Sequence, residues 1–294
     1  MNSIADGSIA MLPAALAGVR VVSIALNLPG PACVRRLADF GATIIKVEPP
    51  DSLGGDPMRM YAPGYYDELH RGLEIQTLNL KSAEGRSALD KLLVTADVLI
   101  TSLREAALER LSLGWDALSA RHPPLCHIAI VGAEAGNDAG HDLTYIAAAG
   151  LATPPHLPVT LIADLAGGER AVSATFAALR MLQQTGRGAR LVVSLATAAH
   201  AFAGPHAHGL TRAGGLLSGG HPGYNFYQAR DGWVVLAALE PHFSARVQAA
   251  SAVEFTSAAL TEYFRQHDVR HWNKWAAQHD IPLATLPSSS TPPR

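Results

Sequence analysis

Residues 19–47 read VRVVSIALNLPGPACVRRLADFGATIIKV, which is the pattern of a strand, a turn, a helix and a second strand. Residues 19–25 are mostly β-branched and apolar, as buried strands are. Pro31 stands near the start of the helical spacing and Gly41 just past its end, positions that these two residue types favour. The segment therefore predicts a β-α-β unit.

The alternation of strands and helices continues to about residue 200. Helical spacing recurs at residues 82–93 and 115–120, and short apolar segments follow at residues 98–101 and 125–131. Such alternation favours a parallel sheet covered by helices on both faces. We therefore expect an α/β fold with a Rossmann-like large domain over residues 1–200. The chain has no G-x-G-x-x-G motif, so no dinucleotide site is indicated.

A long helix is expected after the pair Gly167 and Gly168, because apolar residues then recur at helical spacing and Gly186 stands beyond their end. The start of this helix would point at a loop carrying Asp164. Residues 190–195 predict a further strand.

The pattern changes beyond residue 200. Residues 201–223 are rich in Gly and His without regular spacing, which predicts a linker or flap. Asp231 and Gly232 stand between two apolar segments, and this dipeptide is typical of a β-hairpin turn. We expect a smaller α+β domain over residues 224–287 and a disordered tail over residues 288–294.

The composition is that of a globular enzyme with a substantial core: 294 residues, 48% hydrophobic and 16% charged. A net charge of -2 argues against nucleic acid as a partner. The two cysteines are too few for a disulfide framework, and neither they nor the histidines have the spacing of a metal site. Without a basic leader or a long apolar run, a cytoplasmic protein that does not bind membranes is expected.

Two polar groups stand beside glycines, His141 in GHDLTY (residues 140–145) and Asp164 in LIADLAGG (residues 161–168). An imidazole and a carboxyl group tuned towards neutral pH can remove and return a proton. The residues alone leave other interpretations open. Such a histidine can be a surface or hydrogen-bonded core residue, and Asp164 can be a helix N-cap.

Together with Glu240 in LEPHF (residues 239–243), this order of segments resembles the class III CoA-transferase (CaiB/BaiF) family, and its 2-methylacyl-CoA racemase branch most. The resemblance covers residues 19–285 and implies interlocked dimers. In the racemases a histidine and an aspartate exchange the α-proton of a thioester from opposite faces, and a glutamate orients the histidine. These roles would fall on His141, Asp164 and Glu240. Backbone N–H groups beside the nearby glycines would stabilise the enolate oxygen.

The transferase branch of the family uses the same aspartate differently. By resemblance, Asp164 would attack the thioester as a nucleophile, forming an acyl anhydride and then an aspartyl-CoA thioester. A glycine-rich flap, here residues 214–220, would shield the anhydride from water. The transfer mechanism requires neither His141 nor Glu240, so the resemblance favours proton exchange.

The resemblance also implies a channel for coenzyme A, which would enter as part of the acyl-CoA substrate, with no tightly bound cofactor. Lys46 and Arg110 would be available to its phosphates. The residues expected along the channel are Leu26, Asn27, Pro29, Ala32, Lys46, Ser102, Leu103, Arg110 and Leu111.

The chain also departs from the family pattern. Pro49 and the pair Leu73 and Glu74 stand where relatives often carry basic residues near CoA. Relatives continue beyond the position of Pro287 with a segment that returns to the first domain. We therefore expect a fold truncated at its C-terminus. A homodimer is expected, and a non-catalytic CoA-binding paralogue is the alternative to an enzyme.

Overall fold

A computed structural model describes residues 14–134 and 139–287 of the chain. It divides into two compact units, Met1–Ala203 and Gly204–Arg294, and each is described by itself. The tail expected at residues 288–294 lies outside the described residues.

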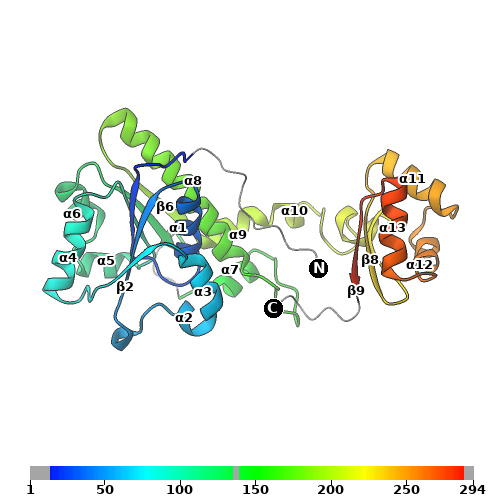
Figure 1. Ribbon diagram of the computed structural model, residues 1–294, viewed down its shortest axis with the longest axis horizontal. Helices are drawn as coiled ribbons and strands as arrows, with labels where there is room; N and C mark the ends of the chain where they lie inside the picture. The colour runs from blue at the N-terminus through cyan, green and yellow to red at the C-terminus, as the bar shows by residue number, and fades with distance from the viewer. Residues whose placement is uncertain (1–13, 135–138, 288–294) are drawn as a thin grey trace. The chain divides into compact units, whose positions relative to one another are not determined.

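The first unit contains a six-stranded sheet in the order β3-β2-β1-β4-β5-β6, in which every neighbouring pair is parallel (Figure 1). The strands are β1 Arg20–Ser23, β2 Thr43–Glu48, β3 Glu74–Thr77, β4 Val98–Thr101, β5 Cys126–Val131 and β6 Arg190–Ser194. The β-α-β prediction and the α/β fold class are confirmed.

Helices cover both faces of this sheet (Figure 1). They are α1 Pro29–Asp39, α2 Met58–Tyr61, α3 Pro63–His70, α4 Ala83–Leu93, α5 Glu105–Arg110, α6 Trp115–Arg121, α7 Asp142–Ala148, α8 Ile162–Thr185 and α9 Leu195–Phe202, with a 3-10 turn at Asp51–Leu53. Val21 belongs to a buried cluster with α1, α7, α8 and α9, whereas Val22 belongs to one with α4, α5 and α6. Successive strand residues point to opposite faces, so Val21 and Val22 are both apolar because both faces of β1 are buried at its centre.

Helix α8 begins at Ile162, so the expectation that it starts after Gly168 is wrong. A Cβ atom on Gly168 would lie 3.1 Å from the carbonyl oxygen of Pro29, and one on Gly167 would lie 2.2 Å from the Leu195 side chain. The two glycines therefore allow α1 and α9 to approach the second turn of α8 closely. The presence of two glycines here is explained by close helix packing and not by the start of a helix. Asp164 consequently lies in the first turn of α8.

The second unit is a small α+β domain with a three-stranded antiparallel sheet in the order β7-β8-β9. Its elements are α10 Gly204–Ala207, a π-helical turn at Leu216–Gly220, β7 Tyr224–Gln228, β8 Gly232–Ala237, α11 Pro241–Ser251, α12 Ser257–Phe264, α13 Val269–His279 and β9 Leu283–Pro287. The predicted hairpin is the β7–β8 pair. Trp272 fills the core and donates its indole N–H to the carbonyl oxygen of Phe264 at 2.9 Å. The third strand, β9, has no counterpart among the predicted elements.

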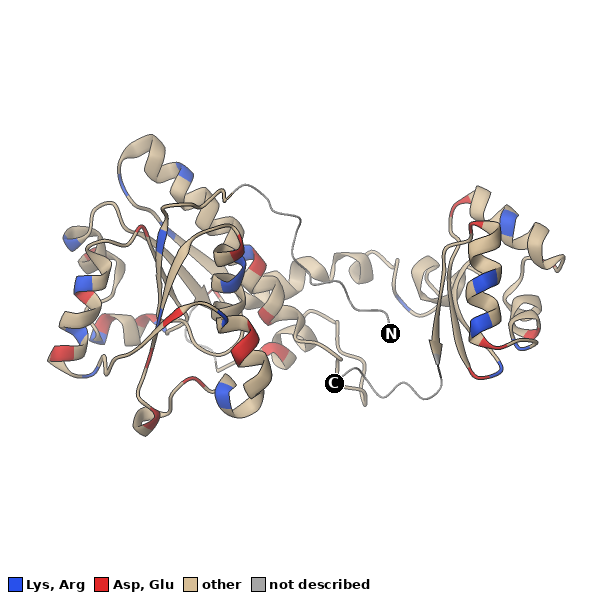
Figure 2. Ribbon diagram, viewed as in Figure 1, with Lys and Arg blue, Asp and Glu red and all other residues tan. Residues whose placement is uncertain are grey.

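Cys33 and Cys126 are both buried, free thiols in the core of the first unit. Figure 2 shows Lys and Arg interspersed with Asp and Glu over the elements of both units, in keeping with the small net charge. Among the described residues, no helix is both long and apolar enough to cross a membrane.

The packing role of Gly168 is testable by substitution. Gly168→Val should lower the free energy of unfolding by about 1–3 kcal/mol, because the added side chain would overlap α1. Gly64 in α3 is a matched control, since a Cβ atom there meets nothing within 4 Å. Gly64→Val should therefore leave stability nearly unchanged. Urea unfolding of the two variants provides the comparison, and equal losses would contradict the assigned packing.

Candidate active site

A cavity of about 280 Å³ opens at the carboxyl ends of β1, β4 and β5. The strand order reverses between β1 and β4, because the chain continues from β1 to one side of the sheet and later returns to the other. Ligands of such sheets bind at this reversal. The residues that line the cavity are Leu26, Asn27, Pro29, Ser102, Leu103, Arg104, Ile130, Val131, Gly132, Ala139, Gly140, His141, Tyr145, Asp164 and Leu195.

Asp164 enters the cavity from the first turn of α8, where it is only 8% exposed. Burial raises the pKa of its carboxyl group to about 6, the neighbouring Asp142 adds to the rise, and His141 partly opposes it. Asp142 is itself buried, and its Oδ1 accepts the backbone N–H of Asp164 at 3.0 Å. Asp142 therefore satisfies one of the free N–H groups at the start of α8.

His141 is the N-cap residue of α7 and is exposed to solvent. Thr144 fixes its backbone, because the Thr144 hydroxyl accepts the His141 N–H at 3.0 Å and donates to the His141 carbonyl oxygen at 2.7 Å. His141 lines the same cavity as Asp164 and lowers the pKa of that carboxyl group. The structure therefore brings the two predicted residues together at one cavity.

Most of the residues expected to contact CoA lie at this cavity or at an adjoining one. The first cavity includes Leu26, Asn27, Pro29, Ser102 and Leu103. A second cavity of about 520 Å³ shares Leu26 and Leu103 with the first and is also lined by Arg110 and Leu111.

Three further basic residues line these cavities, Lys81 and Arg86 the second and Arg104 the first. They are not among the residues that the sequence predicts to contact CoA. Each precedes or lies within a helix without any motif, so no sequence pattern distinguishes it from an ordinary surface charge.

Two residues expected to bind CoA have other roles. Ala32 packs in a cluster with Leu28, Met58, Tyr66 and Leu69. Lys46 is fully buried, and its Nζ donates to Asp56 Oδ2 at 2.7 Å. An ammonium group enclosed in this way is not open to a phosphate, so the expectation for Lys46 is corrected.

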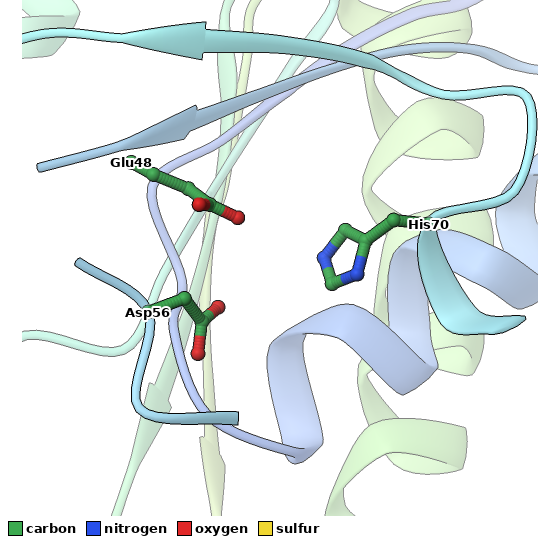
Figure 3. A group of neighbouring side chains, drawn as sticks. All are labelled: Glu48, Asp56 and His70. Atoms are coloured by element: carbon green, nitrogen blue, oxygen red, sulfur yellow. The ribbon is translucent and has the colours of Figure 1, made fainter. Parts of the chain in front are cut away.

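Glu48, Asp56 and His70 surround Lys46 and form a group that could hold a metal ion, with ligand atoms within 4.8 Å of one another. Figure 3 shows the two carboxylates and the imidazole pointing towards a common space. Lys46 Nζ lies 3.2 Å from Glu48 Oε1 and 3.1 Å from His70 Nε2. Because this ammonium group already supplies the positive charge, a metal ion would have to compete with it.

Two other expectations concern the enolate oxygen and Glu240. Gly167 and Gly168 lie inside α8, where backbone N–H groups bond within the helix, so they do not offer the free N–H groups expected of them. Glu240 is the exposed N-cap residue of α11 in the second unit. Its predicted role in orienting His141 stays a prediction.

Comparison with known proteins bears on the chemistry of the cavity. Residues 16–290 match the model of CoA-transferase family III. The chain is 32% identical over 251 residues to alpha-methylacyl-CoA racemase of Homo sapiens, an alignment covering 78% of this chain and 63% of that protein. It is 30% identical over 295 residues to the succinyl-CoA–L-malate CoA-transferase beta subunit of Chloroflexus aurantiacus, covering 90% and 71%. The chain thus spans less than two thirds of the racemase's length.

The fold matches a solved structure as well. A CaiB/BaiF family protein from Brucella suis superposes with a TM-score of 0.77 at 24% identity, covering 94% of this chain and 84% of that one. The likeness extends across both units of the fold described above.

The raised pKa of Asp164 predicts that the free energy of unfolding depends on pH. The folded protein retains the Asp164 proton up to a pH of about 6, whereas the unfolded chain releases it near 3.8. Ionisation therefore favours unfolding, and stability falls as the pH rises through this interval by as much as about 3 kcal/mol.

Asp164→Asn removes the ionisable proton with little change in shape. The variant should gain stability relative to the native chain as the pH rises from about 4 to about 7. Denaturant unfolding at a series of pH values measures this difference. A difference that stays constant with pH would show that the carboxyl group is not perturbed.

Proposed function

This chain belongs to CoA-transferase family III, and we propose that it exchanges the α-proton of a 2-methylacyl-CoA thioester through His141 and Asp164. The observation that carries the proposal is the meeting of these two residues at one cavity, with the pKa of Asp164 raised to about 6. A carboxyl group with such a pKa exists in both protonation states near neutral pH, as an acid–base catalyst must.

The chemistry needs one group to remove the proton beside the thioester carbonyl and another to return a proton from the opposite face. An imidazole takes up and releases protons readily near neutral pH. The carboxyl and imidazole groups come from the starts of two different helices, α8 and α7, so they can act from different sides of a bound carbon. Delivery from the opposite face inverts the configuration.

Transfer of CoA through Asp164 is the second candidate. It is supported by the transferase relative, whose alignment covers 90% of this chain, and by the position of Asp164 at the cavity. A carboxyl group with a pKa of about 6 is mostly ionised at neutral pH, so its pKa is compatible with this role too. The presence of His141 at the same cavity, which the transfer mechanism does not require, favours proton exchange.

The two adjoining cavities suggest how an acyl-CoA would bind. We place the nucleotide in the larger cavity, where Arg110, Arg86 and Lys81 can meet its phosphates. The pantetheine arm would pass Leu26 and Leu103, which both cavities share, and bring the thioester to His141 and Asp164. Coenzyme A is thus part of the substrate, and no tightly bound cofactor is proposed. A homodimer, a cytoplasmic location and the orienting role of Glu240 remain part of the same proposal.

Exchange of the α-proton for deuterium in deuterated water tests the proposed reaction. The native chain incubated with a 2-methylacyl-CoA should lose the α-proton signal in an NMR spectrum. His141→Ala and Asp164→Asn should each slow this exchange by about 100-fold or more, because each removes an acid–base group. Asp116→Asn, an exposed aspartate at the start of α6, is the matched control and should exchange at the native rate.

Other results would identify the alternatives. Labelling of Asp164 by an acyl-CoA that hydroxylamine removes, without α-proton exchange, would favour CoA transfer. Binding of CoA with neither activity would indicate the non-catalytic paralogue, and would contradict the proposed reaction.

The placement of the nucleotide has its own test. Arg110→Ala should weaken CoA binding roughly tenfold, and the effect should shrink at high salt, because an exposed arginine acts on phosphate through screened charge. Arg187→Ala is the control, since Arg187 is exposed in the loop before the amino end of β6. Calorimetry at low and high salt measures both. Equal effects of the two substitutions would contradict the placement.

A further inference from the structure

A buried network centred on Lys46 lies beside the cavity and takes no part in the chemistry proposed above. Lys46 is on β2 and is fully buried. Its Nζ donates to Asp56 Oδ2 at 2.7 Å and lies 3.2 Å from Glu48 Oε1. The third neighbour is His70 Nε2 at 3.1 Å.

The tautomer of His70 follows from its second contact. His70 Nδ1 lies 2.7 Å from the carbonyl oxygen of Tyr66. A carbonyl oxygen only accepts, so Nδ1 carries the proton and Nε2 is left to accept from Lys46. Burial and the Lys46 charge both lower the pKa of His70, which keeps the ring neutral. The ammonium group thus donates to Asp56 and to His70 and forms an ion pair with Glu48.

The charges within the network also balance. Glu48 accepts from Arg59 at 2.9 Å through Oε2 and from the Tyr66 hydroxyl at 2.7 Å through Oε1. Two carboxylates, those of Glu48 and Asp56, therefore face two cations, those of Lys46 and Arg59. A buried ion pair is costly to form and strongly destabilising when one partner is removed. Such a network contributes more to fixing geometry than to net stability.

Asp56 connects the network to the cavity. Its Oδ1 accepts the backbone N–H of Asn27 at 3.1 Å and that of Met58 at 3.0 Å. Asn27 lines the cavity and has a positive φ of 67°, a conformation that residues other than glycine adopt at some cost. The preceding N–H, of Leu26, is bound by Ser102 Oγ at 3.0 Å. Side chains from other elements thus hold two successive amides of the β1–α1 loop.

We propose that Asp56, held in place by Lys46, is a positioning residue for the acyl-CoA site, because it fixes the Asn27 backbone and with it the loop that lines the cavity. Asp56 is not itself at the cavity among the described lining residues. It acts through Asn27. The inference rests on the proposed function only for the identity of the ligand. The hydrogen bond from the Asn27 N–H to Asp56 is present in the protein without a ligand.

Three substitutions separate positioning from general stabilisation. Asp56→Ala removes both the partner of Lys46 and the acceptor of the Asn27 N–H. Asp56→Asn removes the charge but keeps an oxygen that can accept this N–H. His70→Gln disturbs the third neighbour of Lys46 without touching the loop. His70 is not among the described residues that line either cavity, so this variant is the matched control.

Two measurements follow the loop and the ligand separately. Amide hydrogen exchange of residues 24–30 in the free protein should be about tenfold faster in Asp56→Ala, the effect of losing one hydrogen bond. Exchange should stay within about twofold of native in His70→Gln, with Asp56→Asn between them. Calorimetry with CoA as the probe should give the same order of dissociation constants.

The outcomes are distinguishable. Equal changes in Asp56→Ala and His70→Gln would overturn the proposal and leave the network a structural element only. If Asp56→Ala does not fold, Asp56→Asn against His70→Gln makes the same comparison. If CoA fails to bind the native chain, the proposed function is wrong, and the exchange measurement still tests the hold of Asp56 on the loop.

Discussion

The hydrogen bond from the Asp164 N–H to the Asp142 carboxylate is the contact on which the site depends. It joins the start of α7 to the start of α8, and in doing so brings His141 and Asp164 to one cavity. The same contact places one carboxylate close to another and contributes to the raised pKa of Asp164. One contact therefore accounts both for the position of Asp164 and for part of the rise in its pKa. Asp164 is the only acidic residue among the described residues that line the cavity.

Close packing of α1 against α8 positions further residues of the cavity. Gly168 lets α1 approach α8 so that the carbonyl oxygen of Pro29 lies beside it. The β1–α1 loop is thereby set against the helix that carries Asp164, and Asp56 and Ser102 accept two of its backbone N–H groups. The cavity is lined partly by helices and β5 and partly by loops that follow the strands.

The alternating pattern from residue 19 onwards was enough to predict the parallel sheet, and the segments around His141 and Asp164 predicted which residues meet. The start of α8 was not predictable in the same way, because a glycine pair within a helix and one before a helix look alike in sequence. The burial of Lys46 was not predictable for a related reason. Its partner Asp56 lies in a loop and His70 at the end of α3, and only the fold shows that they enclose a lysine of an apolar strand.

Burial of the two cysteines matters for the proposed reaction of a thioester. A thioester donates its acyl group to a thiolate, not to a neutral thiol. Desolvation raises the pKa of Cys33, which lies on α1 close to the cavity loop, and also that of Cys126. Both sulfur atoms therefore stay protonated and enclosed, so they are protected from acylation by the proposed acyl-CoA substrate.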